Sequence, residues 1–186
     1  HLGREDGYLQ KYDSLGTPIW TRQFGTDKND RASGIAVGHS GDIYVVGGTQ
    51  RTINGQTSSG RLDAFLIKYD HTGTELWTRQ FGSSEVDWAY AVAVDGDGNP
   101  YVAGETWGVL GLEAEAGFGN AFVRKYDPIG NILWTHQFGT DQNDMAHELA
   151  TDQHGNIYVS GWTAGDFTGK TTTETYFFRN TIMKDR

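Results

Sequence analysis

The chain has 186 residues, with no cysteine, 26 glycines, 13% aromatic residues and a formal net charge of −9. The lack of cysteine excludes disulfides, cysteine-ligated zinc and thiol chemistry, and the acidic balance argues against phosphate-rich partners, so we expect no nucleic acid. No apolar run approaches the roughly 18–20 residues of a membrane-spanning helix, so we expect no membrane insertion.

One stretch of about 20 residues occurs three times. Its copies are DGYLQKYDSLGTPIWTRQFG, DAFLIKYDHTGTELWTRQFG and NAFVRKYDPIGNILWTHQFG. Their tryptophans, Trp20, Trp77 and Trp134, are 57 residues apart both times (77 − 20 and 134 − 77). Such regularity predicts a repeat architecture. The repeats span 6–62, 63–119 and 120–176, and 177–186 are a tail or the start of a further repeat.

Four strands are expected in each repeat, and the middle repeat gives their order. Residues 65–69 alternate imperfectly between apolar and polar, as a half-covered strand would, and a turn leads to a second strand at 75–81. Residues 89–94 are small and apolar throughout, which predicts a strand buried on both faces. The turn at 95–99 leads to the fourth strand, at 100–104.

Four antiparallel strands per repeat predict an all-β fold made of β-propeller blades, about three in all. The small-residue strand should lie innermost and the tryptophan strand outermost, with Trp20, Trp77 and Trp134 packing between blades. The chain would then begin with two outer strands, continue through two whole blades and add two inner strands. Residues 175–182 could begin one more strand. Closed propellers have four to eight blades, so we expect self-association or further blades in a longer chain.

The repeated residues GxxxWxxQFGxxxxDxAxxxAxxxxGxxYVxGxT resemble the SBBP family of (seven-bladed) β-propeller repeats. The resemblance covers nearly the whole chain, and GNIYVSGWTAGDFTG at 155–169 is especially typical. It implies a propeller of a secreted or surface-associated bacterial protein, hence an extracellular location. The resemblance does not point to any particular activity, and we expect neither an enzyme nor a cofactor.

Recurring aspartates are the candidate metal ligands. Asp30, Asp87 and Asp144 each precede the inner strand of a repeat, and three carboxylates converging near the axis could bind calcium. The alternative is that each carboxylate caps backbone N–H groups of its own loop, which we favour. Residues 95–99, DGDGN, resemble a fragment of a calcium loop but lack its distal glutamate, so we interpret them as a hairpin turn.

Aromatic residues on or beside the variable segments are the candidate ligand-binding residues. Trp107, Phe118 and Trp162 could stack on sugars or anchor a protein, or they could be buried between loops. The leading hypothesis is a non-catalytic scaffold or protein-interaction module outside the cell, which contacts a protein or glycan through its variable loops. The alternatives are a carbohydrate-binding, lectin-like propeller and a polymer-acting enzyme with carboxylates at the propeller axis.

Overall fold

The computed structural model describes residues 3–111 and 118–167, which form twelve strands in four antiparallel sheets. The sheets have the strand orders β1-β2, β3-β4-β5-β6, β7-β8-β9-β10 and β11-β12. The strands are β1 Gly7–Tyr12, β2 Pro18–Phe24, β3 Asp30–Val37, β4 Ile43–Thr49, β5 Asp63–Tyr69, β6 Glu75–Phe81, β7 Asp87–Val94, β8 Pro100–Thr106, β9 Asn120–Tyr126, β10 Ile132–Phe138, β11 Asp144–Thr151 and β12 Ile157–Thr163.

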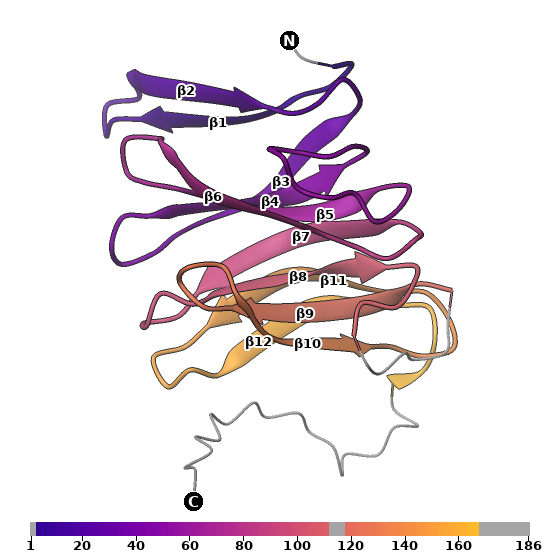
Figure 1. The fold of residues 1–186 in the computed structure, drawn as a ribbon. Helices are drawn as coiled ribbons and strands as arrows, with labels where there is room; N and C mark the ends of the chain where they lie inside the picture. Colours follow the sequence, from indigo (N-terminus) through magenta and orange to yellow (C-terminus); the bar gives the residue numbers. More distant parts are fainter. Residues whose placement is uncertain (1–2, 112–117, 168–186) are drawn as a thin grey trace, which may run out of the picture.

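Each complete sheet is a propeller blade that takes two strands from one repeat and two from the next. The chain therefore begins with the outer pair β1-β2 and continues through two whole blades. The described part then finishes with the inner pair β11-β12, which is the predicted phase of the repeat. Figure 1 shows the four sheets stacked in chain order, with β1-β2 and β12 at opposite ends. The strand expected at 175–182 lies outside the described residues.

Consecutive blades are held together along the inner strands and by aromatic side chains. Strand β7 lies between β3 and β11. Phe81 of β6 meets Phe122 of β9 edge to face, with ring centroids 5.7 Å apart and planes at 87°. A parallel bridge between Leu62 and Val86 also links the blades, and Asp87 N donates to Leu62 O at 2.8 Å. The main core thus lies between sheets, as close packing of two apolar sheet faces requires.

Burial differs from the sequence prediction in two strands. Strand β5 was expected to be half covered, but all seven of its residues are buried, because it lies inside its sheet with blades on both sides. The strand predicted to be buried on both faces is covered only in the middle copy, where Val92 is 8% exposed. Its counterpart Ile35 on β3 is 58% exposed, since no inner strand lies on the other side of β3 within the described residues.

The repeated tryptophans lie on the outer strands β2, β6 and β10. Trp77 meets Tyr44 of its own sheet edge to face at 6.1 Å, and its Nε1 donates to Pro128 O of the next blade at 3.3 Å. Trp134 contacts Tyr101 in the same way, at 5.9 Å. The repeated tryptophan thus covers its own sheet, and Trp77 also bonds to a turn of the next sheet. Within the described residues, no helix is long and apolar enough to cross a membrane.

Candidate functional site

Two of the non-repeating loops, those after β4 and β8, lie at one end of the blades, and a repeated glutamine fixes each of these two. Gln80 Nε2 donates to Arg51 O at 3.1 Å, and its Oε1 accepts from Ile53 N at 2.9 Å. Gln137 holds the next loop in the same way, through Gly108 O at 2.9 Å and the backbone N–H of Leu110 at 3.1 Å. The scaffold therefore positions loops whose sequences differ, which is how repeat folds present variable contacts on a rigid frame.

A row of side chains crosses the three inner strands near this end of the blades. Trp88 Nε1 of β7 donates to Ser33 Oγ of β3 at 2.7 Å, and its ring lies 6.1 Å from that of Tyr90. Tyr90 in turn stacks on His147 of β11, with centroids 5.3 Å apart and planes only 7° from parallel. We call Ser33, Trp88, Tyr90 and His147 the axial row.

The surroundings of the axial row fix the positions of its rings. Trp88 lies over Gly48, where an added Cβ would come within 2.8 Å of the indole, so the glycine makes room for the ring. Tyr90 OH donates to Glu105 Oε1 at 2.8 Å. Burial and then Glu105 raise the pKa of the Tyr90 phenol well above its usual value. The phenol therefore stays protonated and serves as a donor rather than as a base.

The three aromatic residues predicted for ligand binding are all partly exposed, but no ring contact joins them within the described residues. Phe118 is 74% exposed, beside the bridge between Gly119 and Asn143. Trp107 is 49% exposed at the end of β8. Trp162, 48% exposed, lies on β12 beside a cavity of about 230 Å³.

The three recurring aspartates each bind their own loop. Asp87 Oδ2 accepts from Ser83 N at 2.6 Å and from Ser83 Oγ at 2.9 Å. Asp30 and Asp144 accept in the same way from the backbone N–H and hydroxyl of a threonine four residues earlier. Within the described residues, no three His, Asp or Glu side chains gather as a metal site would require. The structure thus places these carboxylates in separate loops and does not bring them together.

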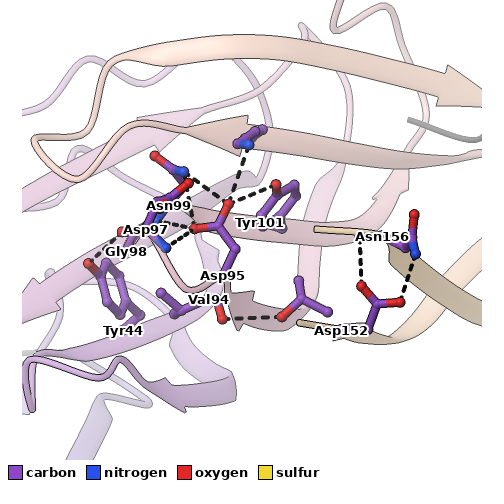
Figure 2. A network of polar contacts seen from close by, with 11 residues as sticks. Tyr44, Val94, Asp95, Asp97, Gly98, Asn99, Tyr101, Asp152 and Asn156 are labelled. Atoms are coloured by element: carbon purple, nitrogen blue, oxygen red, sulfur yellow. Dashed lines mark hydrogen bonds and ion pairs between the residues drawn. The ribbon is translucent and has the colours of Figure 1, made fainter. Parts of the chain in front are cut away.

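Residues 95–99 form a hairpin turn in which the carboxylate is already engaged (Figure 2). Asp95 Oδ1 accepts from the backbone N–H groups of Asp97 and Asn99, at 3.0 and 2.9 Å. Its Oδ2 accepts from Tyr101 OH at 3.0 Å and lies 3.4 Å from Lys125 Nζ. Burial alone would raise the pKa of Asp95, but the bonds from Asn99 and Tyr101 and the charge of Lys125 lower it. Asp95 stabilises the fold.

The axial row was missed by the sequence analysis, although the repeats contain a signal for it. Ala89 and Ala93 recur in all three inner strands, whereas the positions before and after Ala89 change from copy to copy. Arginine, tryptophan and methionine occupy the first position, and serine, tyrosine and histidine occupy the second. Variation inside an otherwise repeated strand marks positions that the fold does not determine.

The comparisons with known proteins agree with the blade architecture. Residues 76–111 and 133–168 match the family model described as SBBP, a beta-propeller repeat. The chain is 31% identical over 166 residues to the regulatory protein FlaEY of Caulobacter vibrioides. The aligned region covers 81% of this chain and 17% of that protein. It is 29% identical over 126 residues to an uncharacterized WD repeat-containing protein of Acanthamoeba polyphaga mimivirus, covering 59% and 9% of the two chains.

A crystal structure of a protein of unknown function from Bacteroides caccae is similar, with a TM-score of 0.46 and 13% identity over 81% of this chain and 45% of that one. The chain spans less than a fifth of the length of the two curated relatives. Their names describe regulatory and repeat proteins, and neither names a reaction.

Proposed function

The chain carries SBBP β-propeller repeats, and we propose that it is a non-catalytic protein-interaction segment that acts outside the cell and binds its partner at the variable-loop end of the blades. One observation carries the proposal: the axial row lies where the repeats differ, and its stacked rings are only partly buried. Aromatic rings that are partly exposed and already held in one orientation are the side chains that most often anchor a protein partner.

Two further features support a binding role. The loops next to the row are held by Gln80 and Gln137, so a partner would meet a prearranged surface and little entropy would be lost on binding. The relatives are named as regulatory and repeat proteins. The family resemblance supports the extracellular location, and protease treatment of intact source cells tests it: the chain should be cleaved without lysis.

Site-specific photo-crosslinking tests the partner-binding surface. A photoreactive phenylalanine at Trp107 or at Phe118 should give the same crosslinked protein on source cells. The same group at Leu15, which is 90% exposed in the turn at the other end of the sheet, should not. Unlabelled wild-type chain should compete, and a Trp88→Ala/Tyr90→Ala chain should compete at least about tenfold less well. Equal yields at Leu15, or equal competition by the double variant, would refute the proposal.

A carbohydrate ligand is the second candidate, and the parallel rings of Tyr90 and His147 favour it, since flat aromatic faces stack on sugar rings. A glycan array with the wild-type chain and with Trp88→Ala decides this case. Binding that disappears in the variant would support a lectin. An array without wild-type binding would rule out the carbohydrate ligands on it and favour a protein partner. We also propose that the segment associates with itself through its open edges.

A further inference from the structure

Both complete sheets contain a lysine held between a tyrosine and a turn carboxylate. Lys125 of β9 lies 4.8 Å from the Tyr101 ring centroid and 3.4 Å from Asp95 Oδ2. Lys68 of β5 occupies the same place in the preceding blade, 2.9 Å from Asp42 Oδ2. In each blade the lysine comes from the third strand, and the tyrosine and carboxylate come from the first hairpin.

The β11-β12 hairpin repeats this receptor without its lysine. Tyr158 OH donates to Asp152 Oδ2 at 3.1 Å, as Tyr101 OH does to Asp95. Figure 2 shows Asp152 bonded to Asn156 across its own turn. Within the described part of the chain no cation pairs with Asp152, and Tyr158 is 59% exposed where Tyr101 is 2% exposed. The hairpin thus has an arranged but vacant place for a lysine.

Strand β1 carries the missing lysine. Lys11 corresponds to Lys68 in the repeat, and its Nζ donates to His71 O at 3.1 Å, as Lys68 Nζ does to Pro128 O at 3.2 Å. Lys68 also has a carboxylate partner, whereas among the described residues Lys11 has none. Lys11 is therefore already positioned by the following blade and lacks only the turn carboxylate.

A contact between an aromatic ring and a glycine is likewise complete in the two whole sheets and incomplete at β1. In the complete sheets Phe65 is paired with Gly47, and Phe122 with Gly104, and both phenylalanines are fully buried. A Cβ on either glycine would approach the facing ring within 2.8 or 2.9 Å, so the ring covers the glycine. The corresponding aromatic residue of β1, Tyr8, is 67% exposed.

We propose that β12 of one copy of this chain pairs with β1 of a second copy, so that β11-β12 and β1-β2 complete one blade between them. The register of the complete sheets places Tyr158 opposite Lys11, Gly161 opposite Tyr8 and Trp162 opposite Gly7. Lys11 then reaches Asp152. This deepens the proposed self-association, and its tests change residues outside the axial row.

The space for the partner hairpin exists beside β1. A cavity of about 490 Å³ is lined by Tyr8 and Leu9 of β1 and by Gly34 and Ile35 of β3. A hairpin seated there would cover Ile35, which is 58% exposed, as β7 is covered on both sides in the complete blades. The cavity beside β12, lined in part by Phe138 and Trp162, would take the β1-β2 pair in return.

Two copies joined in this way use each open edge once. Two whole blades from each chain and two shared blades make six, which lies within the range of closed propellers, and a two-fold dimer pairs both β1 and β12 of each copy. We choose a second copy as the partner of these edges because β1 and β12 are complementary. Lys11 supplies the charge that Asp152 lacks among the described residues, and Tyr8 supplies the ring that would cover Gly161. A monomer with β12 covered by residues 175–182, or by further repeats of a longer chain, is the contrary result.

Sedimentation of the 186-residue chain tests the assembly. We expect a dimer of about 41.2 kDa, twice the 20.6 kDa of the chain. Lys11→Glu and Asp152→Asn should each raise the dissociation constant at least about tenfold, because each leaves a buried charge without its partner. Leu15→Ala, at an exposed turn, should have no effect. Asp152→Gly/Asn156→Asp should restore dimerisation, since it copies the turn in which Asp42 receives Lys68.

Engineered cysteines test the register, since the chain has none of its own. Gln10→Cys with Val159→Cys places two thiols opposite each other in the proposed pairing, within reach of a disulfide. Lys11→Cys with Val159→Cys shifts the pair by one residue to opposite faces. Only the first variant should give a covalent dimer on non-reducing gels. The two edges lie at opposite ends of one chain, so a link within a copy is excluded (Figure 1).

Three results would overturn the proposal. The chain could sediment as a monomer, the dissociation constant of the dimer could be unchanged by Lys11→Glu and Asp152→Asn, or both cysteine pairs could form the disulfide equally. These results are separable from those for the partner site. Photo-crosslinking at Trp107 reports on the loops, and the edge variants lie outside those loops.

Discussion

Replacing Asp63 with asparagine is expected to stabilise the fold at neutral pH. Asp63 and Asp87 are fully buried, and both side chains lie beside Gly82. A Cβ added at Gly82 would lie 2.6 Å from Asp63 Oδ1 and 2.8 Å from Asp87 Oδ2. The two oxygens are therefore no more than 5.4 Å apart, the sum of these distances. Among the described residues Asp63 Oδ1 has no hydrogen-bond partner, so the amide of an asparagine can use that side to donate.

The size of the gain follows from this separation. Two unit charges 5.4 Å apart repel by about 3 kcal/mol at an effective dielectric constant of about 20. Asparagine weakens the bonds that Asp63 Oδ2 accepts from Gln80 Nε2 at 2.6 Å and from Ser59 N at 2.7 Å, at a cost of roughly 0.5–1 kcal/mol each. The free energy of unfolding should rise by about 1–2 kcal/mol, which corresponds to a Tm increase of about 2–8 °C.

The gain should depend on pH in a defined direction. Burial raises the pKa of Asp87, bonds from Thr106 and Ser83 oppose this, and the charge of Asp63 raises it further. A carboxyl whose folded pKa exceeds its unfolded value of 3.8 favours the folded state in acid, and this contribution is lost as the pH rises through the folded pKa. The wild-type chain is therefore penalised at pH 7, and the advantage of Asp63→Asn should shrink towards pH 4.

Urea unfolding at pH 7 and pH 4 measures both effects, and the third repeat supplies the reciprocal variant. Asn120 occupies the corresponding position there, with Asp144 beside it at Gly139. Asn120→Asp should lower the free energy of unfolding at pH 7 by a similar amount, about 1–2 kcal/mol. The reasoning fails if Asp63→Asn destabilises at pH 7, or if Asn120→Asp stabilises.

Three further changes test the contacts that hold the blades and loops. Trp77→Ala should cost about 3 kcal/mol in urea unfolding, because the indole loses Tyr44 and its bond to the next blade, whereas the half-exposed Leu76→Ala should cost less than about 1 kcal/mol. Gln80→Ala should speed hydrogen exchange of the Ile53 amide at least about tenfold and leave the core amides protected. Asp95→Asn should cost about 2–4 kcal/mol at pH 7 by leaving buried Lys125 unpaired. The pKa of Asp95 is lowered in the fold, so the wild-type advantage should be lost as the pH falls below about 3.8.

Much of the architecture followed from the repeat alone. A 57-residue period with four strand signals predicted the blades, and the position of Trp20 near the start of the chain predicted that the first strands are an outer pair. Turn chemistry was also readable, since Asp70 and Gly73 form the turn that their side-chain and backbone preferences indicate, with Gly73 at a φ of 80°.

Burial was harder to predict because it depends on what lies beside a strand rather than on the strand itself. The middle strand 89–94 and its counterpart on β3 have similar composition, yet Val92 is covered and Ile35 is exposed. The strand at 65–69 shows alternation, but a position inside a sheet that is itself between blades buries both faces. No local pattern distinguishes these environments.

The candidate site could not be found by looking for residues that recur, since recurrence here records what the blades need. The repeated Asp87 and Gln80 both turned out to hold loops, and the repeated Trp77 holds neighbouring sheets. The axial row instead combines positions from different repeats that only the stacking of inner strands brings together, as Tyr90 and His147 show. The residues that differ between repeats on one face of the innermost strand are the sequence signal that identifies it.

The same reasoning separates the two surfaces that this chain offers. At the open edges, Lys11 and Tyr8 are residues that the repeat retains in kind, and each has a counterpart buried in a complete blade. Their exposure is thus evidence for an absent blade half. At the axial row, Trp88 is partly exposed and has no counterpart of its kind in the other repeats, so its partial exposure is not a packing contact that the repeat would complete. An exposed residue that the repeat retains indicates assembly, whereas an exposed residue that it varies indicates recognition.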